Sequence, residues 1–105
     1  MAADNAVERL ARLDCCAVSD ALDKLGLAGV VTGLAPLAAA RRIAGRAVTM
    51  KLGVGAPPPG PVRHLGTTAI ECASPGDVIV VEQRSGVDAG SWGGILTLGA
   101  KLRGV

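Results

Sequence analysis

The spacing of hydrophobic residues predicts two helices at the start of the chain. From Ala6 to Leu13, apolar residues recur at helical spacing with charged residues between them, which is typical of an amphipathic helix. A second, shorter helix is expected from about Val18 to Leu25, because Gly26 is a natural residue for ending a helix. We therefore expect two N-terminal helices within about residues 6–25.

The remaining hydrophobic pattern predicts strands and helices in alternation. Apolar and polar residues alternate over Gly45–Leu52, as in a half-buried strand, and a helical stripe follows from Val62 to Ala73. The unbroken apolar run Asp77–Val81 is rich in β-branched side chains, which indicates a fully buried strand. A last helix is expected from about Ile95. The order β-α-β-α favours an α/β fold.

Two segments without a clear period are predicted to connect these elements. Residues 26–44 are rich in Gly, Ala and Leu, and we expect a connection there with a short strand near Val30-Val31. Gly53–Pro61 holds four prolines and three glycines in nine residues. That density excludes a helix or a central strand, so a loop is expected.

The composition is that of one small domain, residues 1–105, with a β-α-β-α core over about residues 45–103. Half of the residues are hydrophobic, yet Trp92 is the only aromatic one, so the core must consist of Ala, Val, Leu and Ile. Such side chains suit closely packed helix–sheet layers better than a β-sandwich. The net charge of +2, without a run of basic residues, disfavours a nucleic-acid partner.

The cysteines and the N-terminus favour a cytoplasmic protein. Cys15, Cys16 and Cys72 are odd in number and lack metal-binding spacing, so free thiols in a reducing cytosol are the plain interpretation. The polar N-terminus does not resemble a signal peptide. No apolar run approaches the roughly 20 residues of a membrane-spanning helix, so no membrane partner is expected.

The segment Gly90–Leu96 joins the second predicted strand to the last helix and is the main candidate site. A strand, a glycine-rich loop and a helix start in succession present unpaired backbone N–H groups, which suit an anionic ligand. The structural alternative is a tight entry into the helix, with glycine serving only close packing. Trp92 within this segment either walls a pocket or fills a core of small residues.

Polar residues near this segment are candidates for a pocket rim. His64, the only histidine, would be a general acid or base if catalytic, but an exposed position at a helix end explains it more simply. Asp88, together with Glu82 and Arg84, follows the predicted buried strand at its carboxyl end, where sites of α/β proteins lie. Solvation of a loop is the alternative for these three residues.

Other polar residues receive structural interpretations. Ser19, Asp20 and Asp23 carry oxygen atoms that suit Mg²⁺, but helix capping and a solvated face explain them better. Cys72 lies on the predicted helical stripe and is interpreted as a core residue, because no base accompanies it. We therefore expect no metal ligand from these residues.

Four sequence blocks stand in a characteristic order and spacing, namely Val18–Asp23, Ala44–Thr49, Ser74–Val81 and Trp92–Leu96. Together they resemble the RraA-like family, over about residues 18–105. This family contains metal-dependent 4-hydroxy-4-methyl-2-oxoglutarate aldolases with oxaloacetate decarboxylase side activity, and regulators of ribonuclease E activity. The resemblance implies a swivelling β/β/α-type layered domain that assembles as a homo-oligomer, a trimer or a hexamer.

The resemblance also implies how a ligand is bound. Residues Gly93, Gly94, Ile95 and Leu96 match the segment whose backbone amides hold the substrate carboxylate in the family's aldolases. A small 2-oxo acid such as pyruvate or oxaloacetate is therefore the expected ligand. Many members of the family carry an acidic residue at the position of Gly94, and this chain lacks that carboxylate.

The catalytic groups that the resemblance implies lie outside this chain. Full-length relatives hold Mg²⁺ or Mn²⁺ through an Asp, and bind substrate through an Arg, in an Asp-Gly-x-x-Arg-Asp motif that belongs beyond Val105. We therefore expect a domain that is incomplete relative to the family, with no catalytic or metal-binding residue of its own and no lyase activity alone. The alternative is a non-catalytic regulatory or assembly module resembling the ribonuclease E activity regulators.

Overall fold

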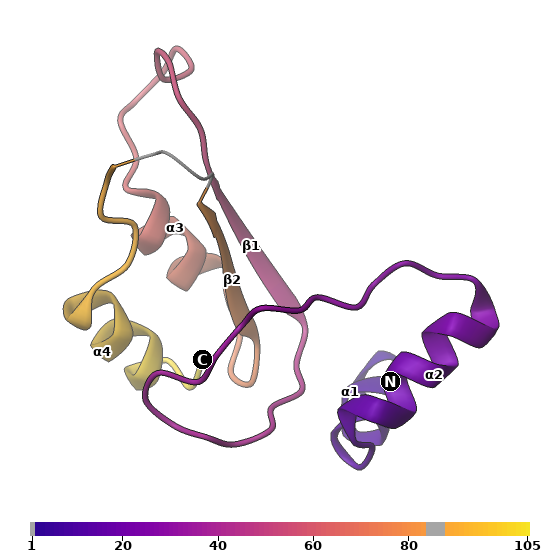
Figure 1. The fold of residues 1–105 in the computed structure, drawn as a ribbon. Helices are drawn as coiled ribbons and strands as arrows, with labels where there is room; N and C mark the ends of the chain where they lie inside the picture. The colour runs from indigo at the N-terminus through magenta and orange to yellow at the C-terminus, as the bar shows by residue number, and fades with distance from the viewer. Residues whose placement is uncertain (1, 84–87) are drawn as a thin grey trace. The chain divides into compact units, whose positions relative to one another are not determined.

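The computed structural model describes residues 2–83 and 88–105, with side-chain exposure given from Asn5 onward. The chain divides into two compact units, Met1–Ala44 and Gly45–Val105. We describe each unit by itself (Figure 1). Within the described ranges, no helix is long and apolar enough to cross a membrane.

The first unit holds the helices α1 (Ala2–Ala11) and α2 (Cys15–Leu25). Helix α1 begins earlier than the predicted position near residue 6, so Asn5 lies inside it. Helix α2 ends as expected, because Gly26 adopts a left-handed conformation with φ 68° and its N–H donates to carbonyl groups of the last turn.

The predicted start of α2 was three residues too late. Its N-cap is Asp14, whose Oδ1 accepts a hydrogen bond of 2.7 Å from the N–H of Ala17. Ser19 and Asp20, the expected capping residues, lie inside the helix instead. The hydrophobic pattern alone hides this start, because Cys15-Cys16 gives no clear helical period.

Residues 27–46 form neither helix nor strand, so the short strand predicted near Val30-Val31 is wrong. A strand needs a neighbour for its backbone groups, and neither described strand pairs with this segment. Its apolar side chains are largely exposed, with Val31 at 74% and Leu34 at 85%. Hydrophobicity alone therefore did not produce a strand here.

The second unit has the predicted order of strand, helix, strand and helix. Strand β1 (Ala47–Leu52) and strand β2 (Val78–Gln83) pair in parallel, from Ala47 opposite Val78 to Leu52 opposite Gln83. Helix α3 (Leu65–Cys72) connects them, and helix α4 (Gly94–Leu102) follows β2. Helix α3 contacts both β1 and α4 (Figure 1). This mixed architecture confirms the α/β class.

The two faces of the sheet differ in polarity. In β1, Val48 and Leu52 are half-buried and Met50 is buried, while the residues between them are exposed, as the alternation predicted. On the other face, the Nζ of Lys51 lies 3.6 Å from the Oε2 of Glu82, its partner in the strand register. This ion pair is exposed, so we assign it little stabilisation.

Strand β2 is not fully buried, which corrects the interpretation of the run Asp77–Val81. None of its residues is buried, and Val80 is 48% exposed. A run of β-branched residues indicates suitability for burial on both faces, but burial itself depends on what packs there. In the described part of the chain, nothing buries Val80.

The core of the second unit is small and lies between the helices and β1. The buried hydrophobic residues are Met50, Ala69, Ala73 and Ala100. The prediction that Cys72 fills the core is wrong, because this thiol is exposed and free. Small side chains permit a close approach of helices, and most of this core consists of alanine.

The ends of α3 and α4 are joined by one side chain. The Nε of Arg103 donates to the carbonyl of Ala73 at 3.2 Å, and its Nη2 donates to the carbonyl of Glu71 at 2.9 Å. The N–H of Gly76 also donates to the carbonyl of Gly104 at 2.8 Å. The two bonds from Arg103 satisfy carbonyl groups at the end of α3, and all three bonds hold the end of α4 beside it.

Candidate functional site: the start of α4

The segment before α4 is held to the end of β2 by side-chain hydrogen bonds. The Nε2 of Gln83 donates to the carbonyl of Ala89 at 2.7 Å, and the Oγ of Ser91 donates to the Oε1 of Gln83 at 2.7 Å. Residues 88–93 are thus positioned although they form no regular structure. Arg84, one of the expected rim residues, lies outside the described residues.

Trp92 braces the first turn of α4. Its Nε1 donates to the Oγ1 of Thr97 at 2.9 Å, and that hydroxyl donates to the carbonyl of Gly93 at 3.1 Å. The N–H of Thr97 also donates to the carbonyl of Gly93, at 3.0 Å. The half-buried indole therefore fixes the position at which α4 begins.

Helix α4 begins without a side-chain cap. Its N-cap, Gly93, has extended backbone with φ −150° and ψ −177°, and as a glycine it supplies no side-chain capping hydrogen bond. The first N–H groups of a helix have no partner within the helix. The amides of Gly94, Ile95 and Leu96 are consequently available to an acceptor, and the helix dipole favours a negatively charged one.

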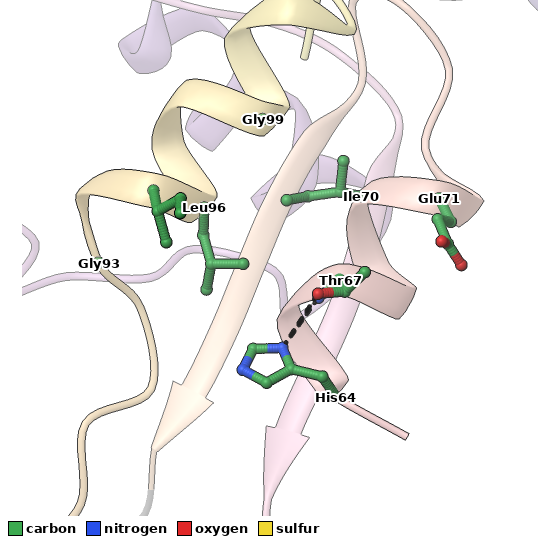
Figure 2. Close-up of a pocket in the computed structure, with 8 residues that line it drawn as sticks. His64, Thr67, Ile70, Glu71, Gly93, Leu96 and Gly99 are labelled. Carbon is green, nitrogen blue, oxygen red and sulfur yellow. Dashed lines mark hydrogen bonds between the residues drawn. The ribbon is translucent and has the colours of Figure 1, made fainter. Parts of the chain in front are cut away.

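A pocket of about 430 Å³ lies beside this helix start, between α4 and α3 (Figure 2). It is lined by residues from the start of α4 and from one side of α3, namely His64, Thr67, Ile70, Glu71, Gly93, Ile95, Leu96 and Gly99. Its volume is in the range of small-molecule sites.

The close approach of α3 to α4 depends on Gly66, which is buried. A Cβ atom at this position would lie 2.7 Å from Leu96 Cδ1 and 3.3 Å from His64 Cε1. The absence of a side chain thus lets Leu96 and His64 reach the same point from two helices. This role of Gly66 could not be predicted from the sequence, because a single glycine in a helical pattern has several explanations.

His64 is the N-cap of α3, and the helix prediction from Val62 was therefore early. Its Nδ1 accepts a hydrogen bond of 3.2 Å from the N–H of Thr67. A backbone N–H is only a donor, so Nδ1 carries the lone pair and the proton of the neutral ring is on Nε2. Figure 2 shows Nε2 on the side of the ring away from Thr67.

The predicted site residues are brought together only in part. Three of the four expected ligand-binding residues, Gly93, Ile95 and Leu96, line the same pocket as His64. Trp92 and Asp88 are not among its lining residues, and Asp88 is exposed. Gly94 lies between lining residues and supplies an amide of the first turn.

The contribution of α3 to the pocket was not predicted from the sequence. Thr67 and Glu71 stand three and seven positions after His64, so they share a face of the helix with it. This spacing was the available signal. It had no value before the contact between α3 and α4 was known, because either face of α3 could have met a ligand.

The described residues do not fit a divalent metal ion. Among them, no group of three or more His, Cys, Asp or Glu side chains could hold one. Of the residue types that bind metal ions, only His64 and Glu71 are among the residues that line the pocket. We therefore derive no step of chemistry through a metal from these residues.

A comparison with protein-family models identifies a family. A family model named RraA-like and described as Aldolase/RraA matches residues 15–105, which includes every helix and strand from α2 to α4. No curated protein and no solved structure matches the chain significantly.

Proposed function

The chain belongs to the RraA-like family, and from this premise we propose that it binds a small 2-oxo acid of the pyruvate type at the start of α4. The observation that carries the proposal is the uncapped first turn of α4, whose residues Ile95 and Leu96 line one pocket together with His64. The amides of residues 94–96 would hold the carboxylate, as the family resemblance implies.

Two physical features support a carboxylate at this position. A helix N-terminus carries a partial positive charge, and its unpaired amides donate hydrogen bonds that strengthen when the acceptor is charged. The Nε2–H of neutral His64 is a further donor at the wall of the same pocket. No ordinary capping side chain competes with a ligand, because residue 93 is glycine.

The proposal assigns binding to this chain and no turnover. In the family's aldolases a divalent metal, Mg²⁺ or Mn²⁺, acts as a Lewis acid that stabilises the pyruvate enolate. The 105 residues contain no Asp-Gly-x-x-Arg-Asp motif, and the described residues do not fit a metal ion. We expect aldolase or oxaloacetate decarboxylase activity only where an Arg and a metal-binding Asp are supplied to the pocket.

The matched variants Gly94→Pro and Gly94→Ala test the binding mode. Proline is tolerated at the first helical position and favours an extended preceding residue, as Gly93 is, but it removes one amide donor. A Cβ at residue 94 would contact nothing within 4 Å, so Ala keeps the donor without a clash.

Calorimetric titration with pyruvate measures the result. Loss of one hydrogen bond to a charged group should weaken binding about tenfold in Gly94→Pro, and Gly94→Ala should bind like the unchanged chain. Equal affinity of all three proteins would contradict the use of this amide. Metal-dependent release of pyruvate by the chain alone would contradict the assignment of binding without turnover.

A second candidate function is a non-catalytic assembly module, as in the ribonuclease E activity regulators. The observation that favours it is an exposed apolar stripe on α4, where Ile95, Leu98 and Leu102 are 84%, 55% and 82% exposed. Exposed apolar surface of this kind is common where proteins associate. A homo-oligomer is therefore proposed, and sedimentation equilibrium that shows a stable monomer would contradict it.

A further inference from the structure

We propose that an arginine-rich surface at the end of α1 binds an acidic segment of a partner protein, in which carboxylate and apolar side chains are interspersed. This arginine surface consists of Arg9, Arg12, Arg41 and Arg42, all of which are exposed. It lies in the first unit, and it does not depend on the ligand site proposed at the start of α4. Arg9 and Arg12 also precede the part of the chain that the family model matches.

One hydrogen bond brings residues that are distant in the sequence together at this surface. Helix α1 has Arg9 in its last turn, and the N–H of Arg12 donates to the carbonyl of Arg9 at 3.3 Å. The Nη2 of Arg42 donates to the carbonyl of Ala11 at 3.4 Å. The pair Arg41-Arg42 therefore lies beside the end of the helix that carries the other two arginines.

The positive charge of the arginine surface exceeds what the end of α1 requires. The carbonyl end of a helix carries a partial charge of about −0.5, which one cation near Ala11 already offsets. The carboxylates nearest in the sequence are those of Glu8 and Asp14, and Asp14 already accepts the hydrogen bond that caps α2. Among the described side chains, the ion pair found joins Lys51 to Glu82, so the four arginines have no carboxylate partner there. A surface of this kind attracts a partner of negative charge.

The arginine surface also has an apolar component. Each arginine or arginine pair in it is followed directly by an exposed aliphatic residue. These residues are Leu10, Leu13 and Ile43, which are 47%, 45% and 61% exposed. Arginine is enriched in protein interfaces, and apolar surface is buried at their centre. A partner with carboxylates alone would leave the aliphatic side chains in water, so the complementary segment carries apolar side chains between its acidic ones.

The same composition disfavours a nucleic acid as the partner. Proteins that bind single-stranded nucleic acid stack its bases on aromatic side chains. Trp92 is the only aromatic residue of the chain, and it belongs to the second unit. A phosphate backbone would pair with the arginines without burying the three aliphatic side chains. We therefore assign the arginine surface to a protein segment.

Fluorescence anisotropy of labelled peptides mixed with the 105-residue chain tests this assignment. The probe peptide repeats Glu-Glu-Leu, and a comparison peptide repeats Glu-Glu-Ser, which has the same charge without apolar side chains. We expect the leucine peptide to bind about tenfold more tightly, because it alone buries apolar surface. Raising the salt concentration from about 0.1 M to about 1 M should weaken its binding, since the screening length falls from about 10 Å to about 3 Å. Absence of binding, or binding that salt does not change, overturns the inference.

Replacement of arginines tests where the leucine peptide binds. Each of Arg9→Gln, Arg12→Gln and Arg41→Gln should weaken its binding about threefold, and the triple variant roughly thirtyfold. Arg42 is retained, because its hydrogen bond holds the segment beside α1. The matched control Arg63→Gln removes an exposed arginine of the second unit and should leave the affinity unchanged. Equal effects of the control and the surface variants, at unchanged helical circular dichroism, overturn the location.

Two further measurements test other occupants of the arginine surface. Oligouridylate that binds as tightly as the leucine peptide, and is lost in the triple variant, would assign a nucleic acid to the surface and overturn the protein segment. Self-association in sedimentation equilibrium that the triple variant abolishes would make a second copy of this chain the occupant, and it too overturns the inference. Pyruvate affinity should be the same in the triple variant and the unchanged chain, so failure of this inference is distinguishable from failure of the proposed function.

Discussion

Helix α2 of the first unit and helix α4 of the second unit begin in opposite ways. In the first unit, Asp14 closes the start of α2 with its own carboxylate, and no residue of α2 is buried. In the second unit, α4 starts on Gly93 with no cap, and it buries Ala100 against its neighbours. The first arrangement stabilises a helix locally. The second leaves amides open and takes its stability from packing.

This difference indicates which of the two helix starts can bind a ligand. An uncapped helix start costs stability, and here it coincides with a packed region that tolerates the cost. The capped start of α2 has no such opening, because a protein carboxylate already occupies the position that an anion would take. Substitutions that remove core packing, and then substitutions at the helix caps, test this difference between α2 and α4.

The largest effect is expected from removal of core packing. Met50 is 5% exposed, so Met50→Ala should destabilise the second unit by about 2–4 kcal/mol through lost burial and a residual cavity. Leu25 in the first unit is 70% exposed, and Leu25→Ala should cost less than about 0.5 kcal/mol. Urea unfolding followed by circular dichroism measures both. Similar losses would contradict the contrast between the units.

A smaller effect is expected from the cap of α2. Asp14→Ala should cost about 1 kcal/mol, because the N–H of Ala17 loses its acceptor. The control is Asp20→Ala inside the same helix, which should change stability by less than about 0.5 kcal/mol. The helical signal of the chain at increasing temperature distinguishes the two variants, and equal effects would remove Asp14 as the cap.

The smallest effect on stability is expected where a cap is added to α4. Residue 93 has extended backbone and free space around a Cβ, so Gly93→Asp should stabilise α4 by a few tenths of a kcal/mol. The new carboxylate would occupy the amides and should abolish pyruvate binding in a calorimetric titration. Gly93→Ala leaves the amides open and should still bind. Full pyruvate affinity in Gly93→Asp would contradict a carboxylate site there.

Much of the fold could be predicted from local patterns. The end of α2 at Gly26 and the alternation of β1 follow from backbone and side-chain preferences that act over a few residues. The burial of β2 could not be predicted, because it depends on what packs against Val80 and not on the strand itself. The start of α2 was hidden because the cap at Asp14 precedes two cysteines that carry no helical signal.

The candidate site, like the fold, could be predicted from the sequence only where it depends on local structure. A strand, a glycine loop and a helix start in sequence were sufficient to indicate the amides near Gly93. The wall formed by Ile70 and Glu71 was not predicted, because it depends on the approach of α3 to α4 over Gly66. Such an approach is a property of tertiary packing.

The most direct test of the central claim is a titration of ¹⁵N-labelled chain with pyruvate, in which two helix starts are compared within one protein. The account predicts shifts of the amides of Gly94, Ile95 and Leu96 that saturate together. It predicts no change at Cys16 or Ala17, where Asp14 already caps α2. Equal shifts at both helix starts, or none at α4, would contradict the account.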